Sequence, residues 1–199
     1  MLSSHPYGPG MLDALSLWSR VAGCCVTSSF CQVNELSKMS SPVVIDFQAF
    51  QDTAWSFIVK ELAVVDVKTR ASSHWIFAPP EWGLASSRSR ILPSNKWLTK
   101  YFHGLHWDDG YTPYHKLKSI LAAAVCKSDL ILVKGYEKSL FIRSLLPDFD
   151  VINLEDIDCP KITTFQNCFK CIFHKENNFK CAKAHCTELA LWYLKDQHL

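Results

Sequence analysis

Four cysteines and two histidines fall within nineteen residues near the C-terminal end of the sequence. In order they are Cys168, Cys171, His174, Cys181, His185 and Cys186. Thiolates and imidazoles are ligands of structural zinc, and the two-residue gap between Cys171 and His174 lets both face one ion. No second close pair completes a zinc finger, so we expect Cys171, His174 and Cys181 to take a fourth ligand from elsewhere. The alternative is a reduced, partly buried thiol pair beside an incidental histidine, and His185 and Cys186 are expected to be ordinary helix-face residues.

The composition indicates a folded domain with a substantial core. The chain has 199 residues, of which 48% are hydrophobic and 13% are aromatic, enough for one domain. The net charge of +2 does not by itself require a nucleic-acid partner, so any basic surface must be local. No apolar run approaches the roughly 20 residues that span a bilayer, and we expect no membrane association.

Cysteine usage favours a reducing compartment. The nine cysteines are odd in number and cluster towards the two ends of the chain, which favours zinc over disulfides and predicts an intracellular protein, cytoplasmic or nuclear. Residues 1–38 are rich in Pro, Gly, Ser and Cys, and no basic residue precedes Arg20, unlike a secretory signal. We expect the folded domain to cover residues 39–199, with residues 1–38 a flexible extension or an artefact of an upstream start.

The hydrophobic pattern predicts an α/β fold with a mixed sheet and flanking helices. Strands are expected at Val43–Ile45, leading into Asp46 and Gln48, and at residues 55–67, 74–78, 130–133 and 151–154. Helices are expected at residues 113–126, 136–146 and 182–194. The first three strands are close together along the chain and suggest an antiparallel meander, and residues 81–112 are expected to be a long connection. Three strands followed by strand–helix–strand indicate a mixed sheet.

This order of elements resembles the ribonuclease-H-like fold, and the residues narrow the resemblance to exonucleases of the DEDD type. Asp46-Phe-Gln48 is similar to the family's first motif, Asp-x-Glu, and residues 133–142 resemble the second motif. On that alignment Lys138 replaces a metal-binding Asp. The segment 181–186 stands where the family has its last motif, a His followed by an Asp. One carboxylate of four therefore remains.

Loss of the carboxylates argues against two-metal hydrolysis, which needs several of them to hold two divalent ions about 3.5–4 Å apart. A Lys138 ammonium would repel such ions, and we expect it to pair with Asp46 instead. No catalytic residue is expected, and Asp46, Gln48 and Lys138 are vestigial candidates. Two other functions stay open: an active metal-dependent nuclease acting on single-stranded nucleic acid, and a pure protein-interaction module.

The chain also resembles the Maelstrom domain of small-RNA silencing proteins, a subgroup with a Glu-Cys-His-Cys zinc site in place of the catalytic set. Cys171, His174 and Cys181 match its Cys-His-Cys part, and the resemblance implies Glu61 as the fourth ligand. The local cluster offers Cys168 as the alternative, which would give a Cys3His site. It would cover roughly residues 43–195, and a neighbouring branch fits equally well. A strand carboxylate paired with Lys60 or Lys68 is the simpler reading of Glu61. The resemblance implies a degenerate nuclease that acts as an RNA-binding or scaffolding module with protein partners.

Residues 82–107 combine aromatic and basic side chains and contain no acidic residue. Aromatic faces can stack on unpaired bases while Lys and Arg follow the phosphates, so this stretch is a candidate surface for single-stranded RNA. Its candidate contacts are Arg88, Arg90, Lys96, Trp97, Lys100 and Tyr101. The alternative is a connection whose tryptophans fill the core and whose basic groups are solvated.

Overall fold

The structure is a computed structural model that describes residues 40–53, 56–81, 92–161, 171–174 and 179–196. The chain divides into two units, Met1–Met39 and Ser40–Leu199, and all described residues belong to the second. The predicted N-terminal extension, residues 1–38, lies outside the described residues.

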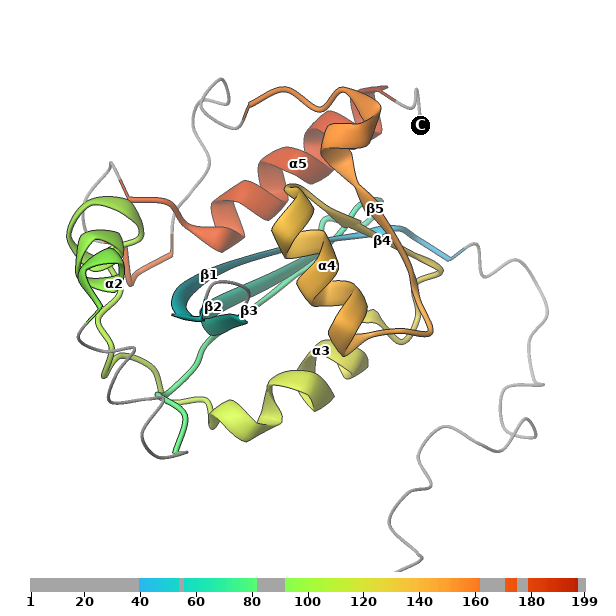
Figure 1. The fold of residues 1–199 in the computed structure, drawn as a ribbon. Helices are drawn as coiled ribbons and strands as arrows, with labels where there is room; N and C mark the ends of the chain where they lie inside the picture. The colour runs from blue at the N-terminus through green and yellow to red at the C-terminus, as the bar shows by residue number, and fades with distance from the viewer. Residues whose placement is uncertain (1–39, 54–55, 82–91, 162–170, 175–178, 197–199) are drawn as a thin grey trace, which may run out of the picture. The chain divides into compact units, whose positions relative to one another are not determined.

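A five-stranded mixed sheet forms the centre of the second unit (Figure 1). Its strands are β1 (Val43–Thr53), β2 (Ser56–Asp66), β3 (Ser72–Ile76), β4 (Leu130–Val133) and β5 (Asp150–Asn153). The spatial order is β3-β2-β1-β4-β5. Strand β2 is antiparallel to both of its neighbours, β1 and β3, whereas β1, β4 and β5 are parallel to one another. The predicted mixed α/β class and the antiparallel meander are confirmed, and the strand bounds differ from the prediction mainly in the length of β1.

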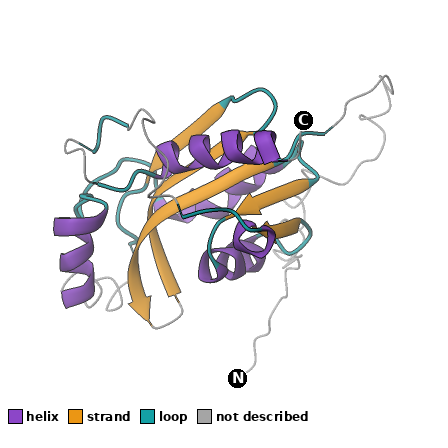
Figure 2. Ribbon diagram, turned by 90° about the horizontal axis from the view of Figure 1, so that it is seen from above, coloured by secondary structure: helices purple, strands orange, loops and turns teal. Residues whose placement is uncertain are grey.

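Helices cover both faces of the sheet (Figure 2). Helices α3 (Leu117–Val125) and α4 (Tyr136–Leu145) pack on one face, and α5 (Ala182–Asp196) packs on the other. Side chains of a strand alternate between faces, so Ile45 and Phe47 join the α3–α4 core whereas Val44 joins the α5 core. Asp46 and Gln48 are two and four residues after Val44, so their side chains point to the same face of the sheet as Val44, the face covered by α5.

The connection expected at residues 81–112 contains helix in its described part. Helix α2 (Pro93–Trp97) continues directly into the π-helical turn η1 (Leu98–Phe102). Pro93 stands in the first turn, where its missing N–H costs no hydrogen bond. The buried Asn95 side chain bonds both backbone groups of Gln51 in β1, at 2.8 Å to N and 2.7 Å to O. These two bonds fix α2 to the end of β1. The sequence predicted a long connection at residues 81–112 but no helix within it.

A β-bulge separates the two ends of the β1–β2 pair. Gln48 pairs with Glu61, but Ala49 pairs with Val59, so Lys60 is the extra residue on β2. Because of the bulge, the Val59 side chain packs in the α3–α4 core. Glu61 lies on the same face of β2 as Ala63 and Val65, which pack against α5. Without this extra residue the two ends of β2 could not both present apolar side chains to the same core.

Lys60 is fully buried, and its ammonium is saturated by backbone carbonyls. The Nζ atom donates to the carbonyl oxygens of Phe77 at 2.6 Å, Trp107 at 2.7 Å and Asp109 at 2.6 Å. Burial lowers the pKa of Lys60 to about 8, against the raising effect of Asp109 and Asp108. The expectation that Lys60 could pair with Glu61 was therefore wrong, since Lys60 ties β2 to the segment after η1.

We predict that Lys60→Met lowers the free energy of unfolding by about 3 kcal/mol, because it leaves buried carbonyl groups without their donor. Urea denaturation measures the change. Lys68→Met is the matched control, since Lys68 is exposed at the end of the same hairpin and surface substitutions usually change stability by no more than about 0.5 kcal/mol. Equal denaturation midpoints for the two variants would contradict the role given to Lys60.

Candidate metal centre and the adjoining pocket

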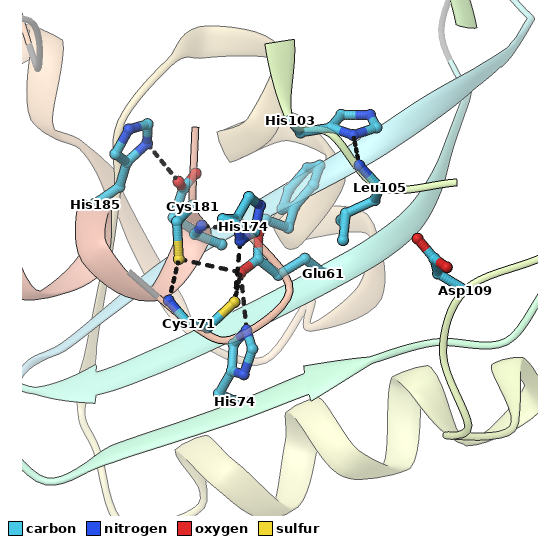
Figure 3. A network of polar contacts seen from close by, with 12 residues as sticks. Glu61, His74, His103, Leu105, Asp109, Cys171, His174, Cys181 and His185 are labelled. Carbon is cyan, nitrogen blue, oxygen red and sulfur yellow. Dashed lines mark hydrogen bonds and ion pairs between the residues drawn. The ribbon is translucent and has the colours of Figure 1, made fainter. Parts of the chain in front are cut away.

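Four side chains from three separate segments meet as a group that could hold a metal ion. Glu61 lies in the middle of β2, Cys171 and His174 lie at the two ends of one turn, and Cys181 immediately precedes α5. One ligand atom from each lies within 4.8 Å of the others. Figure 3 shows the four side chains pointing toward one another. Glu61 stands 110 residues before Cys171, so the group joins distant parts of the chain.

Several separations between these atoms are close to those around a small tetrahedral cation. Cys171 Sγ lies 3.0 Å from His174 Nδ1 and 3.6 Å from Glu61 Oε1, and Cys181 Sγ lies 3.4 Å from the same Glu61 oxygen. Ligands bound to zinc at its usual distances are about 3.3–3.7 Å apart in a tetrahedral site. The donor set of two sulfurs, one nitrogen and one oxygen is also among those that zinc accepts.

Two neighbours orient the Glu61 carboxylate. His74 Nε2 lies 2.8 Å from Oε1, and the backbone N–H of Ala182 donates to Oε2 at 2.9 Å. Glu61 is fully buried, and this burial raises its pKa although His74 opposes the shift. Hydrogen bonds of this kind hold a metal ligand in position. The sequence did not identify His74, although its place on β3 opposite Ala63 puts it diagonal to Glu61.

The electrostatics of the group favour a cation. The hydrogen bond with Cys181 and burial raise the pKa of Cys171, whereas the hydrogen bond from Cys171 lowers the pKa of Cys181 to about 3. The lowered pKa favours the thiolate form of Cys181 beside the buried Glu61 side chain. A divalent cation would neutralise both and would allow the second thiol to ionise as well.

Not every sequence candidate joins the group. Cys168, the alternative fourth ligand, lies outside the described residues. His185 and Cys186 lie on α5, as expected, and neither is in the group. Cys186 is fully buried and its thiol donates to the carbonyl oxygen of Ala63 at 3.3 Å. His185 contacts a different carboxylate.

That carboxylate is Asp46, buried in β1 between a lysine and a histidine. Lys138 Nζ donates to Asp46 Oδ1 at 2.5 Å and to the carbonyl oxygen of Phe47 at 2.7 Å, and His185 Nδ1 lies 3.1 Å from Asp46 Oδ2. Burial alone would raise the pKa of Asp46, but Lys138 and His185 outweigh it, so the pKa is lowered. The predicted pairing of Lys138 with Asp46 is confirmed.

A pocket of about 530 Å³ opens beside this ion pair. The pocket lies where the parallel pairing of the sheet ends. Gln48 comes after the part of β1 that pairs with β4, Lys134 follows β4, and Glu155 follows β5. Ligands commonly bind at this edge in open α/β sheets. Lys138 and His185 also line the pocket, so the vestigial candidates Gln48 and Lys138 lie together on its wall, next to Asp46.

Four of the six candidate nucleic-acid contacts lie on the α2–η1 helix and are exposed: Lys96, Trp97, Lys100 and Tyr101. Trp97 and Tyr101 are 53% and 57% exposed, and Lys100 Nζ lies 4.8 Å above the Tyr101 ring. The tryptophan therefore does not fill the core. Arg88 and Arg90 lie outside the described residues.

The fold and the site define the class: a mixed α/β domain with a buried Glu-Cys-His-Cys group suited to a metal ion. The sequence matches no protein-family model and no curated protein. Among the helices in the described ranges, none combines the length and apolar character needed to cross a bilayer.

Proposed function

We propose that this chain is a ribonuclease-H-like domain, of the Maelstrom type or a neighbouring branch, which binds single-stranded RNA without cleaving it by a metal-dependent route. The pairing of Lys138 with Asp46 carries this proposal. The one carboxylate left from the exonuclease pattern is bound to an ammonium and an imidazole. With both oxygens engaged and a positive charge 2.5 Å away, Asp46 is a poor ligand for magnesium.

We further propose that the Glu61, Cys171, His174 and Cys181 group holds a structural zinc ion. Glu61 and Cys181 are buried, and all four protein ligands are used, as in closed structural sites that leave no position for a reacting water. The ion would fix the turn at residues 171–174 and the start of α5 to the second strand. Its role would be in folding and not in catalysis.

RNA is supported by the surface of the α2–η1 helix. Trp97 and Tyr101 offer exposed aromatic faces, and Lys96 and Lys100 place positive charges beside them. Stacking on such faces requires unpaired bases and is tolerant of sequence, which favours a single strand over a duplex. A place in small-RNA silencing inside the cell, with protein partners, follows from the family resemblance alone.

We predict that a labelled oligouridine binds the zinc-loaded protein and stays intact when magnesium or manganese is added. The double variant Trp97→Ala/Tyr101→Ala should weaken binding by about 2–6 kcal/mol, if each ring stacks on one base. Fluorescence anisotropy and denaturing gels measure the two properties. Metal-free buffer is used instead of EDTA, because a chelator would also remove zinc.

Tyr111→Ala is the matched control, since Tyr111 is an aromatic residue 78% exposed outside the α2–η1 helix. Cleavage that needs magnesium and disappears in Asp46→Asn would overturn the proposal in favour of an active nuclease. RNA binding undetectable even at low salt, where phosphate contacts are strongest, would leave the chain as a protein-interaction module.

A further inference from the structure

The pocket beside Asp46 is lined by more cations than its own carboxylates can balance. Four lysines and two glutamates line it, and both glutamates are exposed to solvent. The lysines are Lys134, Lys138, Lys161 and Lys180. A concave site with an excess of one sign of charge concentrates oppositely charged ligands. The pocket therefore favours an anion.

The lysine ammonium groups differ in their hydrogen-bond and ion-pair partners within the protein. Lys138 is bound to Asp46, and Lys134 Nζ donates to the carbonyl oxygen of Cys159 at 2.7 Å. Lys180 is half-buried, and its ammonium has no hydrogen bond or ion pair to any described residue. Its backbone is nevertheless fixed, since its N–H donates to the carbonyl oxygen of Phe102 at 2.7 Å. A half-buried cation on a fixed backbone is available for a ligand.

The rest of the pocket suits an aromatic, hydrogen-bonding group. Phe47, Phe57 and Phe102 contribute apolar walls. Gln48 is only 3% exposed, and its side-chain amide makes no hydrogen bond to the described residues. Gln48 lines the pocket, so a ligand with donors and acceptors could form hydrogen bonds with its amide there. A nucleobase has both the flat apolar face and the polar edge that these walls require.

The pocket is continuous with the proposed RNA surface. Leu98 and Phe102 of η1 line the pocket, and the Phe102 ring stacks on Trp97 with centroids 6.0 Å apart. Trp97 is also exposed on the outer side of the same helix. A strand lying over Trp97 can therefore place its next nucleotide in the pocket.

We propose that this pocket binds the terminal nucleotide of a single-stranded RNA through its phosphate, with lysine ammonium groups in the role that divalent ions have in two-metal nucleases. The proposal rests on the proposed function and adds that the protein recognises an RNA end. The ligand chemistry is that of a nucleoside monophosphate, so free AMP is a direct probe. Binding requires no magnesium because Lys134 and Lys180, which form no ion pair with a described carboxylate, supply the positive charge.

Isothermal titration of the zinc-loaded protein with AMP, adenosine and inorganic phosphate tests the proposal. AMP should bind about tenfold or more tightly than adenosine, because a charge-assisted phosphate contact contributes at least that factor. Its affinity should be the same with and without magnesium. Lys180→Ala should lower the affinity for AMP about tenfold. Lys118→Ala, which removes an exposed lysine on α3, should leave this affinity unchanged. Gln48→Leu should lower the affinity for AMP more than the affinity for inorganic phosphate.

Linear and circular oligouridine distinguish an RNA end from a free nucleotide. A linear strand with a 5′-phosphate or 3′-phosphate that outcompetes circular RNA, and is displaced by AMP, supports the proposal. Equal binding of linear and circular RNA, with no displacement by AMP, overturns it while the proposed RNA binding stands. AMP binding that requires magnesium, or that Lys180→Ala leaves unchanged, also overturns it.

Discussion

Cys181→Ser is expected to lower the free energy of unfolding by on the order of 5 kcal/mol or more, enough to unfold a domain of ordinary stability. The thiol lies 3.4 Å from Glu61 Oε1 and accepts from the backbone N–H of Cys171 at the same distance. Losing it opens the group that joins β2, the turn at 171–174 and α5. Adding a strong chelator to the native protein should produce the same loss, seen as a fall in the melting temperature. Elemental analysis should find one zinc ion per folded chain before chelation and none after.

Cys126→Ser is the control for this experiment. Cys126 is a free, exposed thiol at the end of α3, so its replacement should change neither the zinc content nor the melting temperature. A Cys181→Ser protein that kept both its zinc and its melting temperature would contradict the metal assignment. Loss of zinc without loss of stability would show that the metal is bound but does not support the fold.

Lys138→Met is expected to cost up to about 3 kcal/mol, the lower end of the effect of removing one partner from a buried ion pair, because the Lys138 side chain is 28% exposed. Asp46 is 2% exposed, so among the described residues its carboxylate would keep only His185 as a partner. The double variant Asp46→Asn/Lys138→Met should recover part of this loss, because it removes the unpaired charge as well. Glu137→Ala is the matched control, since Glu137 is exposed on the same turn of α4. Urea denaturation of the wild type, Lys138→Met, Asp46→Asn and the double variant gives the coupling energy.

The pH dependence of the same pair has a definite sign. Lys138 and His185 lower the pKa of Asp46 below its ordinary value of 3.8, so the stability from this pair is present above pH 3.8 and is lost as pH falls through the lowered pKa. In Lys138→Met, burial instead favours the protonated acid, and its deficit relative to the wild type should shrink as pH falls. A deficit that stays constant from neutral pH to pH 4 would mean that Asp46 is not the group affected.

The sequence predicted the elements whose pattern is local. The alternation of apolar residues in β2 and the periodicity of α4 and α5 locate these elements to within about two residues. The α2–η1 helix was missed because it is only ten residues long, has exposed aromatic residues and is held by the contacts of Asn95 with Gln51. Those contacts depend on which strand end lies beside it, and no local pattern encodes that.

The candidate site divides in the same way. Ligand type and spacing suffice to select Cys171, His174 and Cys181, since all three come from one short segment. Glu61 could be proposed only through a resemblance, because 110 residues of chain separate it from Cys171. His74 and the burial of Lys60 follow from the register of β2 with its neighbours, including the bulge at Lys60, and that register was not readable from the sequence.

The first turn of α5 serves two groups at once. Ala182 N–H binds Glu61 within the metal-binding group, and His185, one turn after Cys181 and bonded to its carbonyl through its own N–H, binds Asp46 beside the pocket. Whatever holds Cys181 in place therefore also positions His185. If binding of the metal raises the affinity of the pocket for its ligand, then binding of the ligand must raise the affinity for the metal by the same factor. The metal content of the domain would thereby affect how tightly it holds the ligand proposed for the pocket.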